Sequence, residues 1–491
     1  MEIVLVSPEV VPFSKVGGLG DVAGSLPKAL KILGHKVTVV SLLYGSINPQ
    51  AGSLARRLMK VRVPLGGETL GMDIHEARLP SGVNVVLLGG PGVSDRQGVY
   101  GDDQGPYADN HRRFGMLCRG AVEWLRAQPR LPDVVHAHDW PSALVPVYLD
   151  LLREEDPRLA QVKTVFTIHN LSHQGTFPLE TLAELGLPAR YGTVDELEFY
   201  GAASWIKGAI LHADRVTTVS PSYAREILSP EGGLGMDGVL RARGELPGIL
   251  NGIDHAVWNP STDPHLASRY DAEDLAGKVR CKSDLQQRLG LPQRPECPVV
   301  GMVARIVAQK GVDLLLAVAP RLLRQELQLV VQGHGDPALL EALTELQKRM
   351  PDRVAFRREW DDGLAHRIYA GSDLFVLPSH FEPCGLSQMY AMRYGAVPVA
   401  RATGGLRDTI VDADAELTTG TGFAFEHPSE EGLYGALSRA LAGYAKRDAF
   451  GRLVRRVMRT DFSWERGARR YQSVYQALCP AAAGTGATAP R

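Results

Sequence analysis

Short apolar, β-branched runs alternate with segments of helical character along nearly the whole chain, and this alternation constrains the fold most. A continuous apolar run of this length is typical of a parallel strand covered by helices on both faces. The chain has 491 residues, and single hydrophobic cores stop growing at about 250–300 residues. We therefore expect an α/β protein with two doubly wound Rossmann-like domains. The expected strands are residues 2–6, 36–41, 83–88, 133–136, 164–168 and 215–219, then 298–304, 327–331, 354–356, 373–377 and 396–399.

A glycine-rich turn follows the first expected strand, where residues 15–21 read Lys-Val-Gly-Gly-Leu-Gly-Asp. A turn that opens a helix aims backbone N–H groups at one point, and the helix N-terminus adds positive potential. Lys15 places a full positive charge beside it. The spacing matches neither the Rossmann nor the P-loop glycine pattern, so the turn predicts an anion site of unspecified type.

The second half repeats this arrangement. Arg305 follows the expected strand 298–304, and Lys310 opens the next helix. The strand 373–377 ends in a loop that contains Glu382. In doubly wound sheets, ligands bind beyond the carboxyl ends of the strands. Cations at two such edges indicate a diphosphate bound between the two halves.

Composition excludes several classes of function. The formal net charge is −1, which gives no sign of a polyanionic or membrane-surface partner. Five scattered cysteines indicate a reducing compartment rather than a disulfide framework or a zinc site. The chain starts with an expected strand and has no apolar stretch of membrane-spanning length. We therefore expect a cytoplasmic enzyme without nucleic-acid or membrane partners.

Further motifs follow in a fixed order along the chain. They are His136-Ala-His-Asp-Trp140, Phe166-Thr-Ile-His-Asn170, Asn251-Gly-Ile-Asp254, Arg305 with Lys310, Phe381-Glu-Pro-Cys-Gly-Leu386 and Thr403-Gly-Gly-Leu-Arg-Asp-Thr409. Together with the glycine turn, these motifs resemble the glycogen and starch synthase family of retaining glycosyltransferases, and specifically its bacterial glycogen synthases. The resemblance implies the GT-B architecture, in which two Rossmann-like domains face each other across a deep cleft.

Turn chemistry near residues 251–254 places the expected domain boundary there. We predict an N-terminal domain, residues 1–250, on the acceptor side and a C-terminal domain, residues 251–459, on the nucleotide-sugar side. The resemblance implies that the C-terminal helix, within residues 460–479, joins the first domain. Residues 480–491 read as a disordered tail.

The resemblance implies transfer of glucose from ADP-glucose to the non-reducing 4-hydroxyl of an α-1,4-glucan, with retention of configuration. The acceptor would be glycogen or a malto-oligosaccharide, and neither a cofactor nor a metal is expected. The transition state should resemble an oxocarbenium ion, with negative charge growing on the departing phosphate. Cations and preorganised donors would stabilise that charge.

The resemblance also assigns roles to residues. Glu382, His169, Arg305 and Lys310 are the expected catalytic group. An aromatic ring at Trp360 would stack on adenine, although it could instead be packed for stability. The expected donor-binding residues are Lys15, Gly17, Gly18, Asn251, Trp360, Cys384, Gly385 and Leu386, and the expected acceptor residues are Glu9, Asp139 and Trp140.

Alternatives stay open from the sequence. A UDP-glucose-using or maltose-1-phosphate-forming transferase shares this scaffold, and a non-catalytic glucan-binding protein is a further possibility. Many retaining transferases carry Glu-x7-Glu, but Tyr390 stands at the second position here. That departure agrees with the glycogen and starch synthase branch. The sequence does not decide between front-face attack and double displacement.

Overall fold

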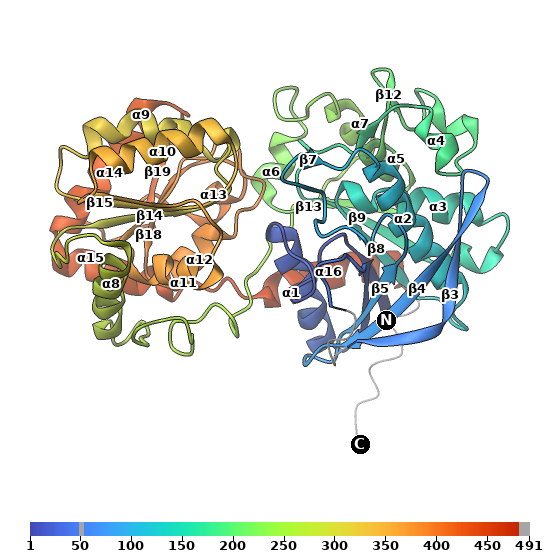
Figure 1. The fold of residues 1–491 in the computed structure, drawn as a ribbon, viewed down its shortest axis with the longest axis horizontal. Helices are drawn as coiled ribbons and strands as arrows, with labels where there is room; N and C mark the ends of the chain where they lie inside the picture. The colour runs from blue at the N-terminus through green and yellow to red at the C-terminus, as the bar shows by residue number, and fades with distance from the viewer. Residues whose placement is uncertain (49–53, 481–491) are drawn as a thin grey trace. The chain divides into compact units, whose positions relative to one another are not determined.

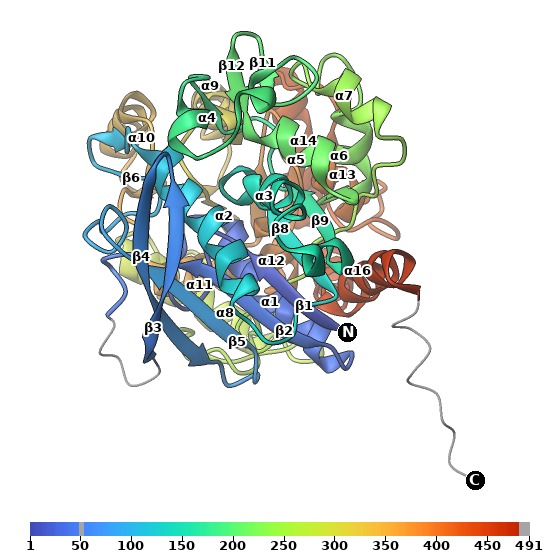
Figure 2. The same ribbon diagram turned by 90° about the vertical axis from the view of Figure 1, so that its right-hand side faces the viewer.

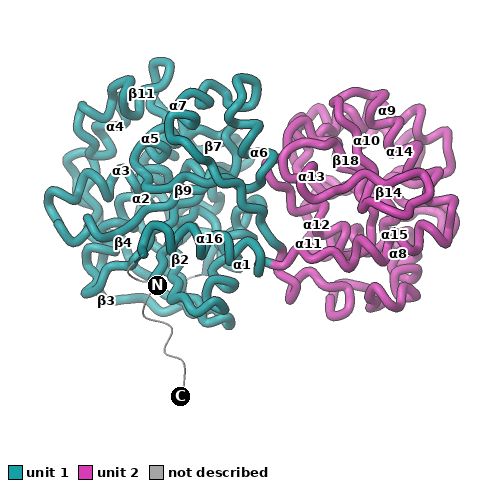
Figure 3. The backbone as a smooth tube through the Cα atoms, turned by 180° about the vertical axis from the view of Figure 1, so that it is seen from behind, with its two compact units in different colours: residues 1–252, 464–491 teal, residues 253–463 magenta. Residues whose placement is uncertain are grey.

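The chain divides into two compact units, which are coloured separately in Figure 3. The computed structural model describes residues 1–48 and 54–480. The first unit contains residues 1–252 and the segment that begins at Trp464, and the second unit contains Ile253–Ser463. The predicted tail, residues 480–491, lies outside the described residues except for Pro480.

The first unit is built on an eight-stranded sheet. Five of its seven strand pairings are parallel, and each strand expected from the sequence is present within one or two residues. In spatial order the strands are β13 (Arg215–Thr218), β9 (Lys163–Ile168), β8 (Val134–His138), β1 (Glu2–Val6), β2 (Lys36–Leu42), β5 (Asn84–Gly89), β4 (Glu68–Arg78) and β3 (Ala55–Leu65).

The last two strands of that order correct the expectation of an entirely parallel sheet. β3 and β4 form an antiparallel hairpin, and β4 pairs antiparallel with β5. Figure 2 shows the hairpin as two long paired ribbons at the edge of the unit. Its outer strand begins with six exposed residues, Ala55 to Lys60, so it lacks the apolar run that identifies a buried strand.

Helices and short elements complete the first unit. Helix α16 packs on α1, and Figure 2 shows both helices in the same part of the unit. The helices are α1 (Gly18–Ile32), α2 (Asn110–Arg126), α3 (Leu144–Leu152), α4 (Thr181–Glu184), α5 (Trp205–His212), α6 (Pro221–Glu226), α7 (Asp237–Ala242) and α16 (Trp464–Leu478). The short strands are β6 (Gly101–Asp102), β7 (Gly105–Pro106), β10 (Thr176–Phe177), β11 (Glu198–Phe199) and β12 (Ala202–Ser204).

The second unit contains a six-stranded sheet whose pairings are all parallel. The five strands expected in this half are present, and a short sixth strand at one edge was not predicted. In spatial order the strands are β16 (Val354–Arg357), β15 (Gln328–Gln332), β14 (Val299–Val303), β17 (Leu374–Leu377), β18 (Val397–Arg401) and β19 (Phe423–Phe425).

Helices cover both faces of the second sheet, as the buried strands require. Figure 1 shows α9, α10 and α14 above the sheet and α8, α11, α12 and α15 below it. The helices are α8 (Ala276–Leu289), α9 (Val312–Leu322), α10 (Pro337–Arg349), α11 (Asp362–Gly371), α12 (Ser387–Arg393), α13 (Gly404–Thr409), α14 (Glu430–Ala445) and α15 (Arg447–Met458). The described part of the chain has no helix that is both long and apolar enough for a membrane span.

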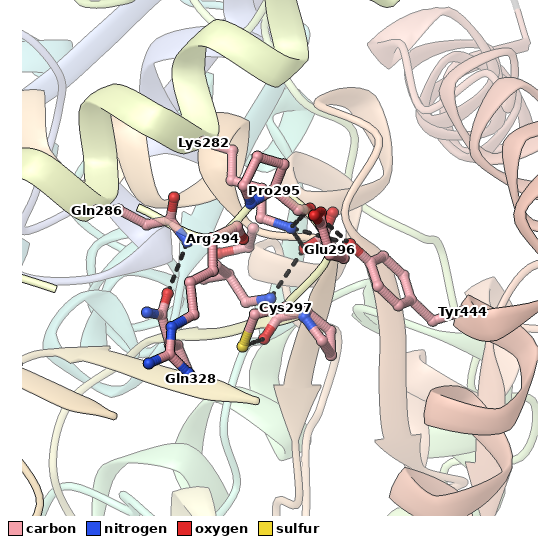
Figure 4. A network of polar contacts seen from close by, with 12 residues as sticks. Lys282, Gln286, Arg294, Pro295, Glu296, Cys297, Gln328 and Tyr444 are labelled. Atoms are coloured by element: carbon pink, nitrogen blue, oxygen red, sulfur yellow. Dashed lines mark hydrogen bonds and ion pairs between the residues drawn. The ribbon is translucent and has the colours of Figure 1, made fainter. Parts of the chain in front are cut away.

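A buried polar network fixes the amino-terminal edge of the second sheet (Figure 4). Lys282 on α8 donates to Asp373 Oδ2 at 2.7 Å, to the Tyr444 hydroxyl at 2.9 Å and to the Pro295 carbonyl at 2.9 Å. The same Asp373 oxygen accepts the Val299 N–H at 2.8 Å. The network therefore holds α8, α14 and the starts of β14 and β17 together, at the edge opposite the predicted site residues.

Candidate active site

Several predicted residues of the first unit lie at the topological switch point of its sheet. Strand β1 pairs with β2 on one side and with β8 on the other, and the connections run outward in both directions. Glu9 and the glycine turn follow β1, whereas Asp139 and Trp140 follow β8. Because β1 and β8 are parallel neighbours, their carboxyl ends meet at the crevice where ligands bind in such sheets.

Glu9 is a buried carboxylate that is bonded at both oxygens. Its Oε2 accepts the Val16 N–H at 2.6 Å and the Gly17 N–H at 3.0 Å. Its Oε1 accepts the Tyr100 hydroxyl at 2.6 Å. Burial raises the pKa of Glu9, and these hydrogen bonds oppose that rise. Two N–H groups of the glycine turn are therefore already bonded to an anion of the chain itself.

The rest of the glycine turn leaves room for a ligand. Helix α1 begins at Gly18 with Gly17 as its N-cap, and a Cβ added to Gly17 would meet nothing within 4 Å. The first N–H groups of a helix have no partner inside it. Lys15 lies beside the turn and forms an ion pair with Asp21 at 2.9 Å. The turn thus combines a cation, helix N–H groups that have no partner inside the helix, and open space beside Gly17.

Asp139 has a strained backbone at the end of β8. Its φ is +61°, which is uncommon outside glycine and tends to occur at functional sites. Its Oδ1 accepts long hydrogen bonds from the N–H groups of His169 and Asn170, at 3.3 and 3.4 Å. Burial raises the pKa of Asp139 to about 7. This carboxyl can therefore hold or release a proton near neutral pH.

Three histidines lie in β8 or just after β9. His169 Nε2 lies 3.0 Å from His138 Nδ1. His136 is bonded at both ring nitrogens, to the Tyr475 hydroxyl on α16 at 2.8 Å and to Thr167 Oγ1 at 2.6 Å. Burial lowers the pKa of His169 to about 3, so the ring is neutral. Because its Nε2 lies within hydrogen-bond distance of His138 Nδ1, the predicted residue His169 is oriented by His138.

The other two predicted residues of this unit lie in different surroundings. Trp140 is half-buried, and its ring is 5.0 Å from that of Phe114 and 6.2 Å from that of Trp205. The Trp140 ring therefore packs among other aromatic rings, whereas acceptor binding stays a prediction. Asn251 is buried, and its Oδ1 has no hydrogen-bond partner among the described residues.

The second unit repeats the switch-point arrangement. Strand β14 lies between β15 and β17, and the connections run outward on both sides. Arg305 follows β14, and Glu382 follows β17. Because these two strands are adjacent and parallel, the two loops meet at one edge of the sheet.

Lys310 and Glu382 form an ion pair, with Lys310 Nζ 2.6 Å from Glu382 Oε2. The same oxygen accepts the Ser379 hydroxyl at 3.1 Å. The side chains are 20% and 8% exposed, so the pair is partly shielded from water. Gly311 has a φ of +68°, and a Cβ there would lie 2.0 Å from the Pro378 carbonyl oxygen. Glycine thus allows the Lys310 turn to approach the Glu382 loop.

Arg305 is exposed and makes no ion pair with any described residue. Its guanidinium lies 3.5 Å from Gln309 Oε1. Gln309 in turn donates to the Phe381 carbonyl at 3.3 Å and accepts the His380 N–H at its own carbonyl at 2.9 Å. Gln309 therefore connects the Arg305 turn to the loop that carries Glu382, and it leaves the Arg305 charge available.

A second glycine turn supports the Glu382 loop from behind. The Gly405 N–H donates to the Glu382 carbonyl at 3.0 Å. A Cβ added to Gly404 would lie 2.0 Å from that same carbonyl oxygen, and one added to Gly405 would lie 2.0 Å from the Cys384 carbonyl oxygen. Cys384 is buried, and Leu386 is the N-cap of α12. Gly385 has a φ of +70°.

Trp360 lies in the loop between β16 and α11. Its side chain is 51% exposed, and its indole N–H donates to Asp362 Oδ1 at 2.8 Å. The ring is therefore held by a hydrogen bond while much of it stays accessible. Among the described residues, no group of three or more His, Cys, Asp or Glu side chains could hold a metal ion.

Comparisons with known proteins agree with this arrangement. Residues 2–242 match the starch synthase catalytic domain family, and residues 286–457 match the family of glycosyl transferases group 1. Glycogen synthase 2 of Geobacter sulfurreducens is 45% identical over 477 residues, covering 97% of this chain and 98% of that protein. The chain belongs to the glycogen and starch synthase family. Glycogen synthase of Koribacter versatilis is 44% identical over 477 residues, again covering 97% of this chain and 98% of that protein.

Solved structures of relatives confirm the fold. The catalytic domain of starch synthase IV from Arabidopsis thaliana, bound to ADP and acarbose, superposes with a TM-score of 0.91 at 36% identity. The match covers 97% of this chain and 99% of that one. Sucrose-phosphate synthase from Thermosynechococcus elongatus shares the fold, with a TM-score of 0.62 at 19% identity and coverage of 98% and 99%. The expected GT-B class of two Rossmann-like domains is thus confirmed.

Tyr390, where many retaining transferases carry a second glutamate, is buried in this family member. Its ring stacks on that of Trp258, with centroids 3.8 Å apart and planes at 22°. Trp258 also stacks on His366 at 4.0 Å. The side chain at this position therefore packs the interior of the second unit and offers no carboxylate to a substrate.

Sequence reasoning missed four residues that contact the predicted site. Tyr100, His138, Ser379 and Gln309 bond to Glu9, His169, Glu382 and the Glu382 loop, respectively. His138 had a usable signal, because it is two residues from His136 and so shares one face of the strand. The others are polar residues outside the strands and α-helices, and nothing in their local pattern separates them from ordinary surface positions.

Proposed function

We propose that this protein transfers glucose from ADP-glucose to the non-reducing 4-hydroxyl of an α-1,4-glucan and retains the α configuration. The observation that carries the proposal is the Lys310–Glu382 ion pair beside the uncompensated Arg305 at the switch point of the second unit. Membership of the glycogen and starch synthase family indicates that the reaction is a glucosyl transfer. The charges of this edge suit a nucleoside diphosphate as leaving group.

In this proposal the second unit binds the nucleotide sugar. The Arg305 fork and the Lys310 ammonium stabilise the negative charge that grows on the departing phosphate. Glu382 faces the transferred glucose and stabilises positive charge at its anomeric carbon. Cys384, Gly385 and Leu386 bring backbone groups to the same ligand.

The first unit, in this proposal, provides the acceptor side and completes the donor site. Its boundaries would be residues 1–250 together with the C-terminal helix. His169 is neutral and oriented by His138, so it can hydrogen-bond a glucose hydroxyl without adding charge. Lys15, Gly17, Gly18 and Asn251 would contact the donor, and Asp139 and Trp140 the glucan. All five cysteines are free, which favours a reducing, cytoplasmic location.

ADP is proposed over UDP because of Trp360. The exposed ring can stack on a base, and stacking is worth roughly 1–3 kcal/mol per base by alanine substitution. A purine presents more ring area than a pyrimidine. The related starch synthase IV structure contains ADP, which supports the same choice.

The decisive experiment measures nucleotide release with glycogen as acceptor. ADP-glucose and UDP-glucose are compared at equal concentration, and Glu382→Gln serves as the control for background hydrolysis. We expect glycogen-dependent ADP release and new α-1,4 linkages; in the NMR spectrum of the product, the anomeric proton coupling reads the α configuration and the chemical shift reads the linkage position. Equal kcat/KM for both donors would refute the donor assignment. Product formation only with glucose 1-phosphate as acceptor would indicate the maltose-1-phosphate-forming alternative.

A further inference from the structure

Glu9 was predicted on the acceptor side, but its contacts point to the donor side. Two of its three hydrogen bonds go to the turn that is expected to meet the diphosphate, at Val16 N–H and Gly17 N–H. The third comes from Tyr100, 91 residues along the chain, at 2.6 Å. The side chain is only 2% exposed. A glucan hydroxyl therefore has little access to this carboxylate.

The surroundings of Glu9 show that the turn is folded around it. A Cβ added to Gly20, on the first turn of α1, would lie 3.2 Å from Glu9 Oε2 and 3.1 Å from the Ser14 carbonyl oxygen. The nearest cation of the turn, Lys15, is paired with Asp21 rather than with Glu9. Backbone N–H groups and one hydroxyl are thus the described groups that satisfy this carboxylate.

We propose that Glu9 is a positioning residue for the donor diphosphate, because it holds the 15–18 turn in its phosphate-binding shape. By bonding the N–H groups of Val16 and Gly17, the carboxylate keeps that part of the backbone turned inward. The next N–H groups, at the start of α1, then point outward beside Lys15. Tyr100 orients Glu9 by its hydroxyl.

The negative charges of Glu9 and Asp21 must be compensated if the turn is to bind an anion. Glu9 and Asp21 are both acidic and both lie beside a site for an anion, so they would repel a diphosphate unless their charges are compensated. The Glu9 charge is spread over three hydrogen bonds, and the Asp21 charge is paired with Lys15. The neutral analogue Gln at position 9 can reproduce the contacts, with its oxygen on the two N–H groups and its amide N–H on the Tyr100 hydroxyl.

The inference rests on the proposed function, since it assumes that the turn binds the donor. The test measures the dissociation constant of ADP by titration calorimetry, together with the KM values for ADP-glucose and for maltoheptaose. Glu9→Ala should weaken ADP binding by about 10-fold, which corresponds to about 1.4 kcal/mol, because the turn loses the carboxylate that holds it while ADP keeps its own contacts. The KM for maltoheptaose should stay unchanged.

Four variants make the result specific. Glu9→Gln should bind ADP within about threefold of the wild type, because its contacts can be kept. Tyr100→Phe should weaken ADP binding less than Glu9→Ala does. The double variant Glu9→Ala with Tyr100→Phe should bind ADP as weakly as Glu9→Ala alone, because Tyr100 acts through Glu9. Glu123→Ala is the matched control: its carboxylate, 13% exposed, is bonded to Arg119 and Arg126 in the same unit. It should leave ADP binding unchanged.

The outcomes separate this inference from the proposed function. If Lys15→Ala weakens ADP binding but Glu9→Ala does not, the positioning role is wrong and the donor turn stands. If Lys15→Ala has no effect either, the turn does not bind the donor, and the donor-binding role that the proposed function gives to the turn is wrong. If Glu9→Ala raises the KM for maltoheptaose and binds ADP normally, the positioning role is wrong and Glu9 contacts the acceptor. The same conclusion follows if Glu9→Gln loses turnover.

Discussion

Replacing Lys310 with Met removes the ammonium that lies 2.6 Å from Glu382 Oε2. The remaining carboxylate side chain is 8% exposed and keeps the Ser379 hydroxyl, at 3.1 Å, as its donor. Two unit charges 4 Å apart interact by about 4 kcal/mol at an effective dielectric constant of about 20. Truncating one partner of a buried pair costs about 3–5 kcal/mol, because the other charge stays uncompensated.

These magnitudes set the expected kinetics. Removal of one preorganised donor to developing charge costs about 10²–10³-fold in kcat. We expect Lys310→Met and Glu382→Gln each to lower kcat by about 10³-fold. Independent effects would multiply to about 10⁶-fold. Residues in direct contact couple by up to about 3 kcal/mol, and residues that act as a unit are far from additive, so the double variant should lose only about 10³–10⁴-fold.

The assay is a double-mutant cycle on initial rates of ADP release from saturating ADP-glucose with glycogen. Arg305→Met combined with Glu382→Gln is the matched control, because no hydrogen bond or ion pair joins Arg305 to Glu382 in the described part of the chain. That control pair should combine with less coupling than the contacting pair. Multiplicative losses in the Lys310 and Glu382 cycle would show that the two groups act separately and would refute the reasoning. Near-wild-type turnover of Glu382→Gln would remove Glu382 from the catalytic group.

Three further results are expected. Trp360→Ala should raise the KM for ADP-glucose and narrow the preference over UDP-glucose while the KM for glycogen stays constant, since the ring is 51% exposed and stacking contributes roughly 1–3 kcal/mol; unchanged donor preference would contradict this. Lys282→Met should destabilise the second unit by about 3–5 kcal/mol in urea unfolding, because it leaves the mostly buried Asp373 without its cation. Lys348→Met, which breaks the exposed ion pair with Glu345, should leave the unfolding midpoint nearly unchanged, and an equal shift in both variants would contradict this reasoning. Burial raises the pKa of Asp139 to about 7, so the folded chain holds a proton that the unfolded chain releases near pH 4. This residue therefore makes the free energy of unfolding fall as pH rises from about 4 to 7. Asp139→Asn should flatten that fall, and an equal slope of unfolding free energy against pH in both proteins would disprove the prediction.

The hairpin β3–β4 is a part of the fold that the sequence pattern did not predict. Residues 55–60 are all exposed, so the start of β3 carries no alternation that a periodicity argument can use. The strand exists because its backbone pairs with β4, and β4 pairs with β5. Pairing partners that are brought together by tertiary structure thus override a sequence that reads as a charged loop.

Glu9 and Trp140 show the same limit at the candidate site. Their positions after β1 and β8 follow from strand order and were predicted. What each side chain contacts was not, because Tyr100 reaches Glu9 across 91 residues and Trp140 packs among rings from other segments. Long-range contacts of this kind leave no trace in local periodicity.

The sequence by itself determined the class of fold and the edge of each sheet where chemistry belongs. Apolar runs require cover on both faces, parallel strands require crossover helices, and residues just after a strand lie at its carboxyl end. The tertiary structure alone decided the pairings between those residues. Lys310 meets Glu382 because the Gly311 backbone approaches Pro378 closely, and Glu9 is bonded to the turn it precedes. Such partners are chosen by close packing of loops from different strands, a constraint that acts only once the sheet has formed.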